Sequence, residues 1–136
     1  MKIFIAIDDK NGMMFNKRRQ SQDAKLREFM LSVCGGGKLY MNEYTFKQFK
    51  DCDVDSIVVA EDFLAVAKGE YCFVENADIS PYLDSVSEVY LCKWNRHYPS
   101  DLKFTAKLAG VFKIVSTNDI VGKSHEKITI EKWSRK

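Results

Sequence analysis

The chain has 136 residues, of which 46% are hydrophobic and 29% are charged, and its formal net charge is +2. These values are typical of one globular domain and exclude a disordered or fibrous chain. The net charge is too small to indicate a nucleic-acid-binding protein by itself. We therefore expect a single domain over residues 1–136.

Targeting and cysteine patterns favour a cytoplasmic protein. No stretch approaches the roughly 20 apolar residues of a membrane span, and the first residues form a strand-like run instead of a secretory leader. The four cysteines (Cys34, Cys52, Cys72 and Cys92) lack the C-x-x-C spacing of zinc or redox sites. We expect them to be reduced thiols.

Residues 2–7, K-I-F-I-A-I, form the stretch around which the chain is organised. A short run of β-branched and aromatic residues is typical of a strand buried on both faces, so it should lie at the centre of a sheet. A turn with an Asn-Gly step follows, and then a loop over residues 13–23 that mixes cations, amides and large apolar side chains. Ligands bind beyond the carboxyl ends of parallel strands, so we expect the functional site to lie at this loop.

Further along, strands alternate with helices. Apolar spacing predicts a helix over 23–33, capped by Ser21 or Asp23 and stopped by the glycines at 35–37. Buried strands are expected at 38–41, 57–60 and 71–74, and short helices at 43–50, 61–68 and 79–86. This alternation indicates parallel crossovers. The last strands, at 89–94, 111–117 and 125–133, should form an antiparallel and half-exposed end of the sheet.

The opening of the chain resembles dihydrofolate reductase. Residues 9–12, D-K-N-G, together with Asp23 match the start of that family in outline. Residues 39–46 lie where the family has a strand that leads into M-G-R-x-T, and Met41, Thr45 and Phe46 agree. Residues 71–91 and the tail continue the resemblance in order. It implies an α/β fold, a dihydrofolate reductase-like mixed sheet with parallel N-terminal strands, crossover helices and an antiparallel C-terminal pair.

A second resemblance concerns small bacterial chains grouped under the name ribonuclease Z. They are similar around N-G-M-x-F-N-x-R-R-Q-S-x-D near the start. The zinc hydrolase of that name needs several histidines with aspartate, whereas this chain has only two histidines. Any ribonuclease activity here would have to be metal-free or magnesium-dependent.

The chain departs from the reductase pattern where a nicotinamide cofactor would bind. Asn42 and Glu43 stand where that family has glycine and arginine, and Glu75 and Asn76 stand where it has paired glycines. A carboxylate about 4 Å from a phosphate would cost roughly 4 kcal/mol at an effective dielectric of 20. We therefore expect no cofactor and consider NADPH-dependent reduction improbable.

Polar side chains follow the predicted parallel strands and fill the loop that faces them. They should gather at one edge of the sheet and suit a polar ligand with several hydroxyl or amino groups, such as a nucleoside. A divalent cation that bridges to phosphate, or simply solvated residues and salt bridges, would also account for them. The predicted ligand-binding residues are Asp9, Arg18, Arg19, Gln20, Asp23, Asn42, Glu43, Glu75, Asn76, Asn95 and Arg96, with Glu61 near them.

A second polar group lies at 94–101, W-N-R-H-Y-P-S-D. Its aromatic, arginine and histidine side chains could stack on and hydrogen-bond a base, although a turn explains most of the same pattern. Catalytic residues are not identified by the sequence, and the candidates are Asp23 and His97. A general base near neutral pH would be His97, His125 or a carboxylate with a shifted pKa.

Three functions stay open at this point. The favoured one is a cofactor-free binding or accessory protein for a nucleoside-like molecule or a macromolecular partner. The alternatives are an enzyme that processes RNA or nucleotides, and an NADPH-dependent reductase with an altered cofactor site. Tyr44, Tyr82, Trp94 and Tyr98 are expected to be exposed and to leave room for a protein interface. We further expect Arg19→Ala to abolish ligand binding while the melting of the free protein changes little.

Overall fold

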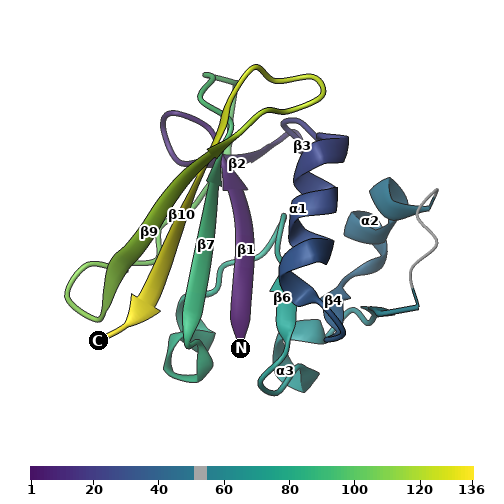
Figure 1. Ribbon diagram of the computed structural model, residues 1–136, viewed down its shortest axis with the longest axis vertical. Helices are drawn as coiled ribbons and strands as arrows, with labels where there is room; N and C mark the ends of the chain where they lie inside the picture. The colour runs from purple at the N-terminus through teal and green to yellow at the C-terminus, as the bar shows by residue number, and fades with distance from the viewer. Residues whose placement is uncertain (51–54) are drawn as a thin grey trace.

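The computed structural model describes residues 1–50 and 55–136 (Figure 1). Its centre is a seven-stranded sheet in the order β5-β4-β6-β1-β7-β10-β9. β1 runs parallel to both of its neighbours, and β10 runs antiparallel to β7 and β9. The expected mixed sheet is therefore confirmed. The strands are β1 (Lys2–Ile7), β4 (Leu39–Met41), β5 (Ile57–Val59), β6 (Tyr71–Phe73), β7 (Glu88–Lys93), β9 (Phe112–Ile120) and β10 (Ile128–Arg135).

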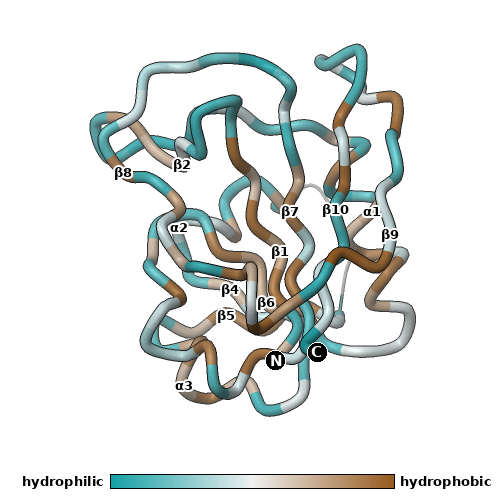
Figure 2. Tube along the Cα trace, turned by 90° about the vertical axis from the view of Figure 1, so that its left-hand side faces the viewer, coloured by the Kyte–Doolittle hydropathy of each residue, from teal (hydrophilic) through white to brown (hydrophobic). Residues whose placement is uncertain are grey.

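β1 is the central strand, as the apolar run predicts. Alternate side chains of a strand point to opposite faces, so the side chains of β1 belong to two separate hydrophobic clusters, one on each face of the sheet. Ile3 and Ile5 belong to one cluster, and Phe4 belongs to the other, where its ring stacks on Tyr90. Both clusters are fully buried at β1, and the hydropathy colouring in Figure 2 is brown along this part of the sheet.

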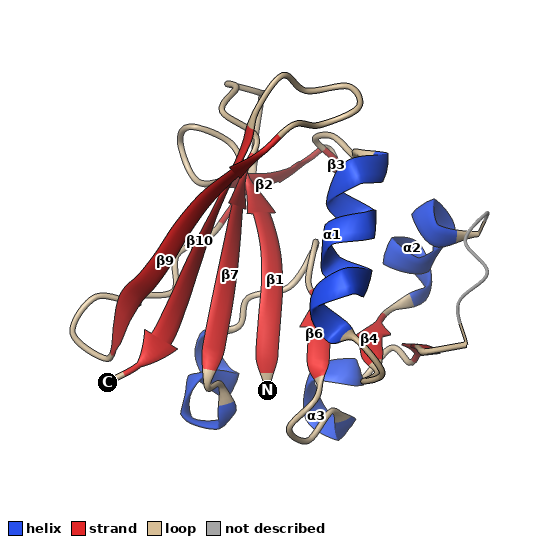
Figure 3. Cartoon of the chain, viewed as in Figure 1, coloured by secondary structure: helices blue, strands red, loops and turns tan. Residues whose placement is uncertain are grey.

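Helix α1 (Ala24–Cys34) covers the face that contains Phe4, through the buried side chains of Leu26 and Met30 (Figure 3). Of the two candidate caps, Asp23 is the one used: its carboxylate accepts a hydrogen bond from the backbone N–H of Lys25 at 2.8 Å. The helix ends at Gly35, whose φ of 57° belongs to the left-handed region.

The remaining helical segments are short, and each lies within the range expected for it. The expected helix at 79–86 is a 3₁₀ helix of six residues, and it ends at the extended backbone of Val86. Phe63 and Leu64 of α3 pack against the face that contains Ile3 and Ile5. The segments are α2 (Glu43–Phe46), η1 (Lys47–Phe49), α3 (Phe63–Val66) and η2 (Ser80–Ser85).

Expectations about three strands are wrong. β7 is not part of a half-exposed, antiparallel end: it runs parallel to β1 and antiparallel to β10, and four of its six residues are buried. β5 is not buried on both faces: it is the edge of the sheet, with only β4 beside it, and Val59 is 38% exposed. The last strand starts at Ile128, not at His125, because residues 122–127 turn inward as a loop toward Asp23. The loop at residues 122–127 changes the description of the functional site.

The loop over residues 13–23 is largely regular structure. β2 (Gly12–Phe15), β3 (Arg18–Arg19) and β8 (Leu102–Lys103) form a second, three-stranded sheet. Asn16 and Lys17 turn the hairpin with φ values of 53° and 60°, the left-handed pair that two-residue hairpins favour. Met13 and Met14 of β2 are buried in the same cluster as Ile5 and Ile7 of β1, so this small sheet packs at the carboxyl end of β1.

Three of the four cysteines are buried free thiols: Cys34, Cys72 and Cys92. Cys52 lies outside the described residues. Burial raises the pKa of Cys34 to about 11 and the pKa of Cys72 to about 12. In the part of the chain that the structure covers, no helix is long and apolar enough to cross a bilayer.

Candidate functional site

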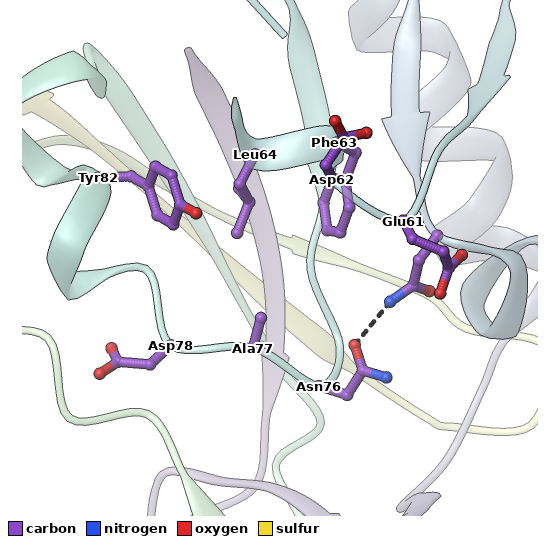
Figure 4. Close-up of a pocket in the computed structure, with 9 residues that line it drawn as sticks. Glu61, Asp62, Phe63, Leu64, Asn76, Ala77, Asp78 and Tyr82 are labelled. Atoms are coloured by element: carbon purple, nitrogen blue, oxygen red, sulfur yellow. Dashed lines mark hydrogen bonds between the residues drawn. The ribbon is translucent and has the colours of Figure 1, made fainter. Parts of the chain in front are cut away.

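A cleft of about 420 Å³ lies beyond the carboxyl ends of β4, β5 and β6 (Figure 4). We call it the acid–amide cleft, because carboxylates and amides surround an apolar wall. Figure 4 shows Tyr82 and Asp78 on one side of it and Glu61 and Asn76 on the other. The lining residues are Asn42, Glu61, Asp62, Phe63, Leu64, Asn76, Ala77, Asp78 and Tyr82.

The amides of the cleft are held in fixed positions. The Asn42 side chain caps α2, where its Oδ1 accepts a hydrogen bond from the backbone N–H of Thr45 at 3.0 Å. Its Nδ2 donates to Asn76 Oδ1 at 2.8 Å. Because Asn42 is 8% exposed and Asn76 is exposed, the pair presents the Asn76 amide to solvent. A ligand therefore meets a polar group that is already oriented.

The carboxylates give the cleft a negative charge. Glu61 Oε2 accepts a hydrogen bond from the backbone N–H of Glu43 at 2.9 Å, and Asp78 Oδ1 accepts one from the backbone N–H of Ser80. The hydrogen bonds from Ser80 hold the pKa of Asp78 below its usual value, so this carboxylate is ionised at neutral pH. The described lining contains three acids and no basic side chain, and it therefore favours neutral or cationic ligands.

Arg19 forms a clamp beside the cleft. Its guanidinium donates to both oxygens of Glu75 at 3.0 and 3.2 Å, and to the carbonyl oxygen of Tyr44 at 2.9 Å. The same group lies 4.4 Å from the centroid of the Tyr44 ring. The side chains of Arg19 and Glu75 are only 18% and 7% exposed. Because all of these contacts are with groups of the protein itself, Arg19 has a structural role.

A second buried network surrounds Asp23. Its Oδ2 lies 2.9 Å from His125 Nδ1, and its two oxygens accept hydrogen bonds from the backbone N–H groups of Lys123 and Ser124. Burial opposes its ionisation, but hydrogen bonds from Lys123, His125 and Ser124 outweigh burial and hold the pKa of Asp23 well below its usual value. Its ionised form therefore stabilises the fold at neutral pH, and this contribution is lost on acidification.

His125 is the functional-site candidate that the sequence analysis misplaced. It is 3% exposed, its ring stacks on Trp94 at 4.5 Å between centroids, and its Nε2 lies 3.0 Å from Ser21 Oγ and 3.2 Å from the Tyr98 hydroxyl. The strict alternation after it suggested a strand. Gly122, three residues upstream, was the available indication of a loop.

Asp8 is a second buried polar residue that the sequence-based prediction did not include. Two consecutive aspartates follow the first strand, and the prediction named Asp9. Asp8 is 2% exposed, and it accepts hydrogen bonds from the backbone N–H groups of Gly12 at 2.7 Å and Tyr98 at 3.1 Å. The side-chain amide of Gln20 also donates a hydrogen bond to Asp8 Oδ2, at 3.1 Å. Asp8 therefore ties the turn, the small sheet and the 94–101 loop together, whereas Asp9 is exposed.

The predicted ligand-binding residues do not form one cluster. Asn42 and Asn76 line the acid–amide cleft, and Glu43 contributes its backbone N–H next to it. Asn95 and Arg96 instead hold the 122–127 loop region, through Lys127 and Ser124 carbonyl oxygens. Arg19 and Glu75 form the clamp. Gln20 donates a hydrogen bond to Asp8, and Asp23 contacts His125. The remaining predicted residues lie at the exposed surface: Asp9, Arg18 and His97.

The expectation of four exposed aromatics is wrong. Trp94 is 4% exposed because it packs against His125, and Tyr44, Tyr82 and Tyr98 are half-buried. The pattern that suggested a protein interface is therefore part of the fold. Over residues 1–50 and 55–136, no group of three or more His, Cys, Asp or Glu side chains is arranged to hold a metal ion.

Comparisons with known proteins support the fold. No family model matches the chain, and no curated protein matches it. Among solved structures, it is similar to dihydrofolate reductase from Enterococcus faecalis complexed with NADP(H) and RAB-propyl, with a TM-score of 0.70 and 13% identity. The match covers 98% of this chain and 95% of that chain. The chain therefore has a dihydrofolate reductase-like fold, and the ribonuclease Z resemblance finds no support in these comparisons.

Proposed function

We propose that the protein is a cofactor-free binding protein on a dihydrofolate reductase-like fold, and that it holds a nucleoside-like molecule in the acid–amide cleft. The observation that carries the proposal is the cleft's composition: oriented amides and carboxylates face an apolar wall, with no basic group in the described lining. A cytoplasmic location belongs to this proposal, and a macromolecular ligand remains its alternative.

The chemistry of the cleft matches the parts of a nucleoside. Carboxylates such as Asp78 and Glu61 accept hydrogen bonds from hydroxyl or amino groups, and the Asn76 amide can both donate to and accept from a base edge. The rings of Tyr82 and Phe63 provide apolar surface against which a base can pack. A phosphate would face three acids without a compensating cation, so we expect nucleosides to bind better than their phosphate esters.

A nicotinamide dinucleotide does not fit these residues. In the dihydrofolate reductase family, such a cofactor is held by close approach of glycine backbone and by cations near its phosphates. Here the backbone N–H of Glu43, a candidate phosphate donor, is already occupied by the Glu61 carboxylate. The Arg19 guanidinium, a candidate cation, is occupied by Glu75. These contacts make a reductase the least favoured of the three functions.

Thermal unfolding with a panel of nucleosides and their 5′-monophosphates tests the proposal. At saturation, at least one nucleoside should stabilise the protein by roughly 2–4 kcal/mol, and its monophosphate should stabilise it less. Asp78→Asn should weaken this effect, because it removes a charge from the lining. The matched control is Asp84→Asn, which removes an exposed acid of η2 outside the lining.

Two results would contradict this assignment. A monophosphate or NADPH that stabilises the protein more than any nucleoside would show that the cleft tolerates anions. Equal loss of stabilisation in Asp78→Asn and Asp84→Asn would show that the ligand binds elsewhere.

A further inference from the structure

Ser21, His125 and Asp23 are arranged as a nucleophile, a base and an orienting acid. We propose that these three residues form an ester-hydrolysing site, separate from the acid–amide cleft. Ser21 Oγ lies 3.0 Å from His125 Nε2, and His125 Nδ1 lies 2.9 Å from Asp23 Oδ2. Such a relay is recognised by its geometry and not by chain order, and these distances lie within the hydrogen-bond reach that it requires.

The ionised Asp23 selects the tautomer that a base needs. An ionised carboxylate only accepts hydrogen bonds, so the Nδ1 of His125 carries the proton and donates it to Asp23. Nε2 is then left with a free electron pair, which points to the two hydroxyl donors of Ser21 and Tyr98. The ring is held in place by Trp94, which stacks on it with an angle of 24° between planes. The imidazole is therefore oriented before any substrate binds.

A cavity that could receive a substrate is lined by neighbours of the triad, although not by Ser21, His125 or Asp23 themselves. Ser21 is half-exposed, whereas His125 and Asp23 are buried behind it. A cavity of about 340 Å³ is lined by Gln20, the chain neighbour of Ser21, and by Tyr98, the second partner of His125. Phe15 and Pro99 add apolar surface to it, and Arg18 adds an exposed cation. We therefore expect esters with a flat apolar group that carries a negative charge.

The hydrolytic step balances with water as the only co-reactant. Ser21 Oγ forms a bond to the ester carbonyl carbon while its proton passes to His125 Nε2, and the carbonyl oxygen becomes an oxyanion. The bond from carbon to the alcohol oxygen then breaks, and the alcohol takes the proton from Nε2. Water repeats the sequence on the acyl-Ser21 ester and releases the acid. Within the described residues, the backbone N–H groups of Ser21 and Gln22 make no hydrogen bond, and we expect one of them to donate to the oxyanion.

A fluorophosphonate reporter tests the nucleophile directly. Its reaction forms a bond from phosphorus to Ser21 Oγ and expels fluoride, so it needs no knowledge of the natural ester. We expect labelling of the intact protein at Ser21, mapped by peptide mass spectrometry, and complete loss of it in Ser21→Ala. The matched control is Ser32→Ala, which removes an exposed hydroxyl from α1 and should leave labelling unchanged.

Two further variants separate catalysis from structure. Ser21→Ala should fold normally, because Tyr98 still donates to His125 Nε2. Tyr98→Phe should retain or increase labelling, because it removes the tyrosine hydroxyl that competes with Ser21 for the hydrogen bond to His125 Nε2. His125→Gln should lower the labelling rate at least about 100-fold, the range of general-base catalysis, with folding checked by circular dichroism.

The proposal is overturned if the folded protein is not labelled, or if the label maps to another serine. It is also overturned if folded His125→Gln reacts as fast as the unaltered chain, since Ser21 would then act without its base. Neither result bears on nucleoside binding in the acid–amide cleft, which is measured separately by thermal unfolding.

Discussion

Replacement of Arg19 by alanine tests the structural role of the clamp. The change removes two hydrogen bonds to Glu75, one to the Tyr44 carbonyl oxygen, and the contact with the Tyr44 ring. It leaves a carboxylate that is 7% exposed without its counter-charge. Removing one partner of a buried ion pair typically costs 3–5 kcal/mol, and because the guanidinium is 18% exposed we expect about 3 kcal/mol. For a chain of this size the melting temperature should fall by about 10 °C.

The assay is urea unfolding at pH 7, followed by far-UV circular dichroism and by the fluorescence of Trp94 and Trp133. The midpoint should fall while the slope of free energy against urea stays the same, because the surface exposed on unfolding is unchanged. The control is the double variant Arg19→Met with Glu75→Gln, which removes both charges and should recover at least about half of the lost stability.

A free energy of unfolding within about 0.5 kcal/mol of the unaltered chain would refute this reasoning for Arg19→Ala. It would instead support the sequence-based expectation that Arg19 serves a ligand and that the free protein does not need it. The two interpretations therefore predict opposite results for the same variant without any ligand present.

Three other predictions concern Asp23, Gly122 and two buried thiols. Asp23→Asn should lower stability by about 1–3 kcal/mol at pH 7, and the difference from the unaltered chain in urea unfolding should shrink below about pH 5, since a lowered pKa stabilises only while the carboxylate is ionised. Gly122→Ala should cost about 1–3 kcal/mol in thermal unfolding, because a Cβ there would lie 2.6 Å from the His125 carbonyl oxygen and 2.7 Å from Asp23 Oδ2; a neutral effect would show that the 122–127 loop relaxes freely. Cys72 and Cys92 should resist iodoacetamide until the protein unfolds, because burial raises their thiol pKa values, and mass mapping that finds rapid alkylation in the native state would contradict their burial.

The fold was largely predictable from local patterns. The unbroken apolar run at 2–7 identified the central strand, because a strand buried on both faces needs apolar residues at every position. Strand and helix alternation up to residue 86 identified the parallel half of the sheet. The position of β5 at the edge was not predictable, since an edge strand with apolar residues has the same local pattern as a buried one.

The candidate site was predictable only in part. Asn42 and Asn76 were identified because each follows a strand, and the ends of parallel strands meet at one edge of the sheet. The partnership of Arg19 with Glu75 joins residues 56 positions apart, and no local pattern reports such a contact. The same limit applies to Asp23 and His125, which are 102 positions apart.

By itself the sequence determined the order and type of the main elements, because hydrophobic periodicity and turn residues act over a few neighbouring positions. Only the tertiary structure decided which acids are free to meet a ligand and which are bound by the protein. Glu75 is paired with Arg19, and Asp23 is paired with His125. Asp78 and Glu61, in contrast, line the cleft. The physical reason is that charge pairing depends on distance in space, and the fold brings together residues that the chain separates by dozens of positions.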